Sequence, residues 1–298
     1  MTATITNRPH RTATPTRRTA QPRKYPIGKV LLTGLAWLIG VFFLAPYLVM
    51  FTTALKPAGE LGASPATFVP NHWDWANFID VWSWQGHAVL TSLKVTLVIA
   101  GASTLIVVLV SIPAAYYTAR HQFRGRTPFL LLVLITQMFA PTALVVGLYR
   151  EFLQLNLVNS YLALILVNAG FNLAFSIWIL QGYFTSIPVE LEEAAMLDGL
   201  GRFGSMMRVT LPLAAPGIVT AVIFTFIAAW NEFVVALTLT TTPDHQPLTV
   251  TLDRFIGAYH IDWQFLFAGS IFAVVPVVVL FALIERYLVG GLTAGSVK

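Results

Sequence analysis

Six long apolar runs constrain this chain more than any other feature of its sequence. A helix needs about 20 mainly apolar residues to cross the hydrocarbon core of a bilayer, and every run reaches that length. Only 10% of the 298 residues are charged, whereas a soluble globular domain has about 25%. We therefore predict an all-α polytopic membrane protein with six transmembrane helices, at about residues 30–53, 88–119, 128–149, 161–180, 212–240 and 265–289.

The basic residues near the span ends predict the orientation, because Lys and Arg are enriched on the cytoplasmic side of membrane proteins. If the N-terminus is cytoplasmic, the opposite side carries only Lys56, Lys94, Arg150 and Arg254. We therefore predict that both termini are cytoplasmic. The net charge of +5 follows from this topology, so we expect no nucleic-acid partner.

Residues 1–26 differ from the rest of the chain. They are rich in Thr, Arg and Pro and contain no acidic residue. Such a segment cannot bury enough apolar surface to fold, so we predict a disordered basic cytoplasmic tail. The tail either acts only as a topogenic signal or also contacts anionic membrane lipid. The remaining residues, 27–298, are expected to form the transmembrane domain.

Several kinds of chemistry lack support in the sequence. The chain has no cysteine, which excludes disulfides and thiolate metal sites, and its histidines lack metal-ligand spacing. We predict no metal site and no catalytic residues. Residues 290–298 come nearest to a phosphate-binding loop, but their lysine is misplaced and the chain ends where a helix should follow. We therefore expect no directly bound cofactor and no ATP hydrolysis by this chain.

Polar residues inside the predicted spans indicate a candidate passage through the membrane. Polar side chains in lipid are costly and usually face the bundle interior or a wet cavity. We expect the passage to be lined by Gln137, Asn168, Asn172, Asn231 and Glu232. Hydrogen bonding between helices, worth about 0.6 kcal/mol on average in membranes, explains the amides equally well. Prolines within the spans add weak support, because broken helices recur in transporters: Pro113, Pro141, Pro216 and Pro276.

The most polar stretch beyond residue 30 is Glu190–Pro212, which we call the charged segment. We expect Ser186 to cap a helix that starts near Glu190, and Gly199 and Gly201 to end it. Pro212 is expected in the first turn of the fifth span.

This helix has features suited to contact with a partner. Ala194 and Ala195 are small enough to allow close approach, and Glu192, Glu193 and Asp198 offer negative charge. An ordinary solvated loop is equally consistent with these residues taken alone.

The charged segment also contains a spaced motif. Glu193-Ala-Ala-Met-Leu-Asp-Gly199 is followed, after nine residues, by Val209-Thr-Leu-Pro212. This pattern resembles the EAA loop of bacterial ABC-importer permeases, in which EAA, three residues, Gly and nine residues precede Ile-x-Leu-Pro. Val209 in place of Ile is the one departure. The runs Ala229–Phe233 and Gly291–Lys298 are similar to the second, maltose-type permease of the carbohydrate-uptake branch, and the resemblance covers residues 27–298.

The resemblance implies a function that composition does not provide. It implies the type I importer permease fold and a non-catalytic subunit of an ATP-driven sugar importer in the bacterial cytoplasmic membrane. Such a subunit forms half of the pathway with a homologous permease and works with an extracytoplasmic sugar-binding protein. Two partner ATPase subunits bind ATP and Mg²⁺. The EAA coupling loop spans 186–212, with the ATPase-coupling residues Glu190, Glu193, Ala194, Ala195, Asp198, Gly199 and Pro212.

Two alternatives remain open from the sequence. One is a permease of another ABC branch, for amino acids, phosphate or polyamines, although the C-terminal GLTAG run argues against it. The other is a proton-coupled carrier or a membrane-embedded enzyme that uses Glu232, the only acidic residue within a predicted span core. The identity of the sugar cannot be read from the residues.

Overall fold

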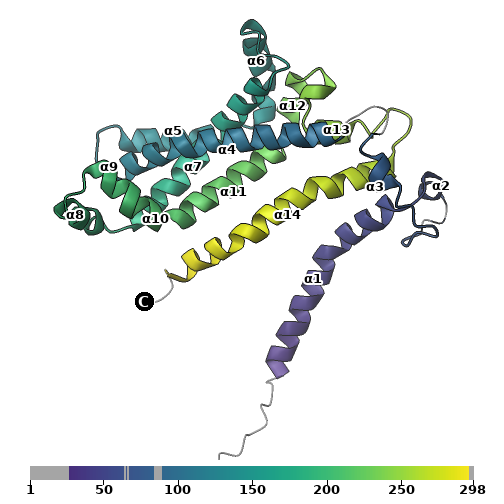
Figure 1. The fold of residues 1–298 in the computed structure, drawn as a ribbon, viewed down its shortest axis with the longest axis horizontal. Helices are drawn as coiled ribbons and strands as arrows, with labels where there is room; N and C mark the ends of the chain where they lie inside the picture. Colours follow the sequence, from purple (N-terminus) through teal and green to yellow (C-terminus); the bar gives the residue numbers. More distant parts are fainter. Residues whose placement is uncertain (1–26, 64, 66, 84–88, 295–298) are drawn as a thin grey trace, which may run out of the picture. The chain divides into compact units, whose positions relative to one another are not determined.

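The computed structural model describes residues 27–63, 65, 67–83 and 89–294. Of these residues, it describes the side chains of all except 27, 30 and 284–294. The predicted tail, 1–26, and the last four residues lie outside the described part. Within the described residues no strand forms, and the only pairing of extended chain is an isolated bridge between Ile256 and Ile261. The prediction of an all-α protein is confirmed (Figure 1).

Helix α1 (Ile27–Ala54) is mainly apolar, and Lys29 in its first turn is its one charged residue. Its residues from Leu31 to Ala54 have a mean hydropathy of 2.1, and no side chain in the most apolar stretch is buried. The part up to Tyr47 forms a unit separate from residues 48–298. This helix is therefore long and apolar enough to cross a membrane by itself.

The centre of the second unit is a bundle of long helices: α4 (Val89–Arg120), α7 (Tyr161–Ser186) and α11 (Ala215–Trp230). Figure 1 shows α4, α7 and α11 running side by side, with α14 (Trp263–Ala294) along α11. Apolar side chains of α4, α7 and α11 form a buried cluster that includes Ala115, Leu180, Phe184 and Ala221. Buried hydroxyls add contacts between helices, such as Ser176 to Thr225 at 3.0 Å.

Two of the predicted spans are broken. The third consists of α5 (Arg126–Thr136) and α6 (Pro141–Gln154), which meet at 94°. Ala140 is extended at the break, as expected for a residue before proline, and Pro141 lacks the amide that would continue the helix. The described residues thus hold four unbroken helices that are long and apolar enough to cross a membrane, or up to six spans if each strongly bent helix pair is counted as one.

The fifth predicted span begins and ends differently from the prediction. Pro212 was expected in its first turn, but it lies in α10 (Leu211–Leu213), before a bend of 73°, and α11 begins at Ala215. Helix α11 stops at Trp230, and a short helix α12 (Val234–Leu239) follows after a break. The chain then forms a 3₁₀ turn, η3 (Pro243–His245), and α13 (Leu248–Asp253) before α14. Two short helices, α2 (Ala58–Leu61) and α3 (Asn77–Asp80), follow α1.

Candidate functional site

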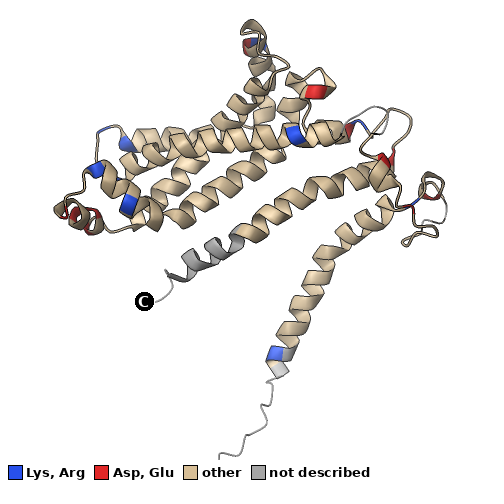
Figure 2. Ribbon diagram, viewed as in Figure 1, with Lys and Arg blue, Asp and Glu red and all other residues tan. Residues whose placement is uncertain are grey.

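The charged segment forms a short helix followed by a tight return to the bundle. Helix α8 (Glu190–Leu197) is followed by α9 (Arg202–Ser205), the π-helix η2 (Met206–Thr210) and α10 (Leu211–Leu213). Residues 202–213 then meet α11 at an angle of 73°. Acidic and basic residues of the charged segment and the α4–α5 turn gather at one end of the bundle (Figure 2).

The expected cap of α8 by Ser186 is wrong. Ser186 is the last residue of α7, and its hydroxyl donates to the carbonyl of Tyr183 at 2.7 Å. Ile187 precedes Pro188 and is extended (φ −83°, ψ 123°), because proline disfavours helical geometry in the residue before it. Helix α7 therefore ends at Ser186, and α8 begins after Val189 without a side-chain cap. Acids in the first turn of α8 are favourably placed near the positive end of the helix dipole.

Gly199 ends α8, as predicted. Its φ of +94° lies in the left-handed region that glycine adopts readily. The amide of Gly199 donates to the carbonyl of Met196, and the amide of Leu200 donates to that of Ala195, both at 3.1 Å. These two bonds make a Schellman motif with Gly199 at the C′ position. Gly201, at φ −72°, is instead the residue before α9.

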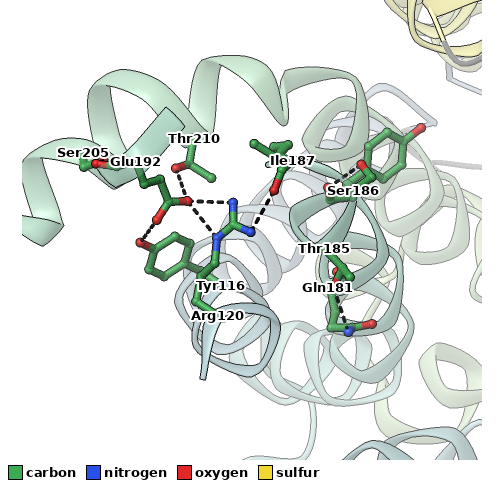
Figure 3. Close-up of polar contacts among 10 residues, drawn as sticks. Tyr116, Arg120, Gln181, Thr185, Ser186, Ile187, Glu192, Ser205 and Thr210 are labelled. Carbon is green, nitrogen blue, oxygen red and sulfur yellow. Dashed lines mark hydrogen bonds and ion pairs between the residues drawn. The ribbon is translucent and has the colours of Figure 1, made fainter. Parts of the chain in front are cut away.

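Glu192 is held inside the protein by the side chains of Tyr116, Arg120 and Thr210 (Figure 3). We call these three residues together with Glu192 the Arg120 clamp. Its Oε1 accepts hydrogen bonds from Arg120 Nε at 2.8 Å and Thr210 Oγ1 at 2.6 Å. Its Oε2 accepts one from the Tyr116 hydroxyl at 2.7 Å. Arg120 Nη2 lies 2.7 Å from Oε1 as an ion pair, and the side chains of Arg120 and Glu192 are each only 7% exposed.

The electrostatics of the clamp keep Glu192 ionised. Burial raises the pKa of the Glu192 carboxyl, but hydrogen bonds from Thr210, Tyr116 and Arg120 and the charge of Arg120 outweigh burial, so the pKa lies below its ordinary value. We expected Glu192 to offer charge to a partner, and the structure contradicts this. Its negative charge is already paired inside the protein.

The remaining predicted coupling residues divide between two faces of α8. Ala195 is only 9% exposed. It follows Glu192 by three positions, so the two residues lie on the same inner side of α8. We therefore do not expect Ala195 to touch a partner directly. The other predicted residues are exposed: Glu190, Glu193, Ala194, Asp198, Gly199 and Pro212. Large apolar side chains are exposed beside them, namely Leu191, Leu197 and Phe203, of which Leu197 is 90% exposed.

The residues predicted to line a passage are scattered. Asn168 and Asn172 donate to carbonyls one turn earlier in their own helix, at 2.9 and 2.8 Å. Gln137 donates to the carbonyl of Phe171 in α7 at 3.1 Å, and Asn231 donates to that of Ile227 at 2.9 Å. None of the five lines the apolar cavity of about 380 Å³ between α5, α6 and α7. The passage stays a prediction.

Glu232 has a structural task in the break between α11 and α12. Its Oε1 accepts a hydrogen bond from the amide of Val235 at 2.7 Å, and its Oε2 accepts one from the amide of Ala236 at 2.9 Å. The carboxylate thus satisfies two of the free amides at the start of α12. This contact explains the presence of an acidic residue in the span without any proton-transfer role.

Sequence reasoning missed three residues of the clamp: Tyr116, Arg120 and Thr210. Arg120 was already explained as a basic residue at a span end predicted to be cytoplasmic, and Tyr116 and Thr210 belong to no motif. The sequence does carry a signal for the acid that these residues hold. Among the acids at the start of α8, Glu192 differs in helical phase from Glu193 by about 100°, so the two carboxylates point to different sides of the helix.

Solved structures of other proteins include one with a similar arrangement of helices. The fold resembles a bacterial ABC transporter that imports the acidic polysaccharide alginate. The TM-score is 0.73 at 20% identity, with 90% of this chain and 99% of the other covered. The fold is therefore that of an ABC-importer permease.

The family follows from the sequence comparisons. Residues 111–293 match the family described as binding-protein-dependent transport system inner membrane component. The chain is 35% identical to the sulfoquinovosyl glycerol transport system permease SmoH of Agrobacterium fabrum, over 91% of this chain and 94% of the relative. It is 33% identical to the trehalose/maltose transport system permease MalG of Thermococcus litoralis, over 93% and 99%. The chain belongs to this family of inner-membrane transport components.

Proposed function

We propose that the chain is one permease subunit of an ATP-driven sugar importer. It pairs with a homologous permease to form the translocation pathway and receives sugar from an extracytoplasmic binding protein. The family description and the two sugar-transport relatives support this proposal. ATP and Mg²⁺ are bound by two partner ATPase subunits, and this chain has no catalytic role.

The observation that carries the proposal is the outer face of α8. Glu190, Glu193, Ala194 and Leu197 follow one another at spacings of three, one and three residues and are all exposed, so they share one side of the helix. Several large apolar side chains are exposed beside these acids, namely Leu191, Leu197 and Phe203, and such a group suits contact with a protein partner. The resemblance of residues 193–212 to the EAA loop supports an ATPase subunit as this partner.

Each predicted coupling residue has a proposed role. Glu190, Glu193 and Asp198 contact basic groups of the ATPase, and Ala194 allows close approach between them. Gly199 ends α8 with the left-handed turn described above, and Pro212 leads back into the bundle. Ala195 supports α8 from beneath. Of the predicted passage residues, the exposed amides of Gln137 and Asn231 are the better candidates for sugar contacts, because Asn168 is buried.

The test is sugar uptake and ATP hydrolysis by the complex of this chain with its partner subunits, reconstituted in vesicles. Glu193→Ala should leave membrane insertion intact and lower sugar uptake at least ten-fold. Glu151→Ala is the matched control, because Glu151 is also exposed and lies in α6, outside the charged segment. Wild-type uptake by the Glu193 variant would exclude the proposed contact. Uptake that persists without the ATPase and follows the proton gradient would exclude an ATP-driven importer.

A further inference from the structure

Arg120, together with its partner Glu192, connects four separate elements at one end of the bundle. It is the last residue of α4, and its Nη1 donates to the carbonyl of Ile187, the residue that follows α7, at 2.9 Å. Its Nε and Nη2 contact Glu192 in α8. Glu192 in turn accepts a hydrogen bond from Thr210 in η2. The pair of Arg120 and Glu192 therefore joins the ends of two long helices to both halves of the charged segment (Figure 3).

Neighbouring contacts strengthen the same junction. The ring of Tyr116 packs edge-on against Phe184 of α7, with 5.8 Å between ring centroids. The hydroxyl of Ser205 in α9 donates to the backbone carbonyl of Glu192 at 3.3 Å. Charged hydrogen bonds in a buried site are short and directional, so this cluster resists sliding more than apolar packing does.

The backbone alone attaches α8 to the bundle less firmly than the clamp does. Only Ile187, Pro188 and Val189 connect α7 to α8, and on the other side the chain passes through Gly199 and Gly201. Residues 202–213 then bend by 73° into α11. Without the clamp, α8 would be free to turn about these connections while the long helices stay in place.

We propose that the Arg120 clamp makes α8 and the adjoining ends of α4 and α7 one rigid body, so that a displacement of α8 tilts the long helices instead of bending the loop. Arg120 is then a positioning residue for transport, acting through Glu192 and the carbonyl of Ile187. The transport part of this proposal rests on the proposed function, whereas the rigid-body part does not.

A double substitution separates positioning from folding. Removing only one member of a buried ion pair strands the other charge and is strongly destabilising, whereas replacing both members by apolar residues is often neutral. Arg120→Met combined with Glu192→Met should therefore assemble with the partner subunits, although the links to Ile187 and Thr210 are lost. Arg124→Met is the matched control, because Arg124 is an exposed base just beyond α4.

Spin-label distances test the rigid body directly. The chain has no cysteine, so cysteines introduced at the exposed positions Leu109 in α4 and Met196 in α8 can be labelled selectively before the chain is assembled with its partner subunits. We expect a distance distribution at least two-fold broader in the double variant than in wild type or Arg124→Met. Equal widths in all three would overturn the proposal. Arg120→Lys gives an independent measurement if the double variant does not assemble, because lysine cannot hold Glu192 and the Ile187 carbonyl with a planar fork. It should broaden the distribution, and an unchanged width would overturn the proposal.

The ratio of sugar transported to ATP hydrolysed tests the positioning role. We expect the double variant to hydrolyse ATP within two-fold of wild type and to transport at least ten-fold less sugar per ATP. A wild-type ratio in the double variant would show that the clamp serves stability alone and would overturn the positioning role. Failure of the wild-type complex to import any sugar would instead refute the proposed function, while the distance measurement would still decide whether the rigid body exists.

Discussion

Gly199 allows a sharp test of how the charged segment is shaped. It is the left-handed residue of the Schellman motif that ends α8, with φ +94°. No atom lies within 4 Å of the position that a Cβ would take, so Gly199→Ala creates no clash with its surroundings. The whole cost is then the backbone strain of an L-residue in this region, about 1–2 kcal/mol. This corresponds to a factor of roughly 5–30 in a local opening equilibrium.

The measurement is amide hydrogen exchange over the turn between α8 and α9. The amides of Gly199 and Leu200 donate the two bonds of the motif, so they should exchange roughly 5–30 times faster in Gly199→Ala. Gly201→Ala is the control. Gly201 also has open space around it, but its φ is −72°, so alanine is accommodated without strain and exchange should stay the same or slow slightly.

The comparison of the two alanine variants decides the argument. Equal exchange in Gly199→Ala and Gly201→Ala would refute the claim that backbone strain at one position controls the turn. Gly199→Asn adds a third point, because asparagine tolerates the left-handed region better than alanine. Its exchange should lie between those of wild type and Gly199→Ala.

Three further predictions concern other parts of the bundle. A Cβ at Gly217 would lie 2.4 Å from Cγ of Tyr183, so Gly217→Ala should lower the free energy of unfolding by about 1–3 kcal/mol, as measured by thermal denaturation. Gly170→Ala is the control, because a Cβ there has open space around it and should leave the free energy of unfolding unchanged. The side-chain oxygen of Asn159 accepts three hydrogen bonds from Thr241 and Thr242. Asn159→Gly removes these bonds but can still adopt the φ of 62°, so it should lower the free energy of unfolding by about 1–3 kcal/mol in the same assay. The lowered pKa of Glu192 stabilises the fold above about pH 4.3, the ordinary Glu value. The advantage over Glu192→Gln should therefore be constant from pH 8 to 5 and disappear as the pH falls through the lowered pKa, as measured by chemical denaturation.

The long apolar runs made the helical membrane fold predictable, because in lipid a helix pairs the backbone groups of such a segment within the segment itself. The breaks were harder to foresee. Pro141 marked the break between α5 and α6, but the end of α11 at Trp230 has no proline nearby. There the helix stops within an apolar run, and the carboxylate of Glu232 stabilises a new start at α12. Hydropathy averages over such a local event and cannot show it.

The charged segment was likewise only partly predictable from the sequence. The spacing from Glu193 to Pro212 was readable, because a motif is a pattern along the chain. The clamp depends on two residues, Arg120 and Glu192, that are 72 positions apart. Only the packing of α4 against α7 brings them together, and no local rule of sequence contains that contact.

Helical phase explains how one short helix serves two purposes. In α8, Glu192 and Ala195 are three residues apart and both are buried, whereas Glu190 and Glu193 are three apart and both are exposed. A helix places residues at this spacing on one side, so the inner pair attaches α8 to the bundle while the outer pair remains available to a partner. The motif of Glu193, Ala194 and Ala195 therefore crosses from the outer face to the inner one. Its second alanine is buried on the inner face, whereas its glutamate is exposed and the pairing with Arg120 is made by Glu192 instead.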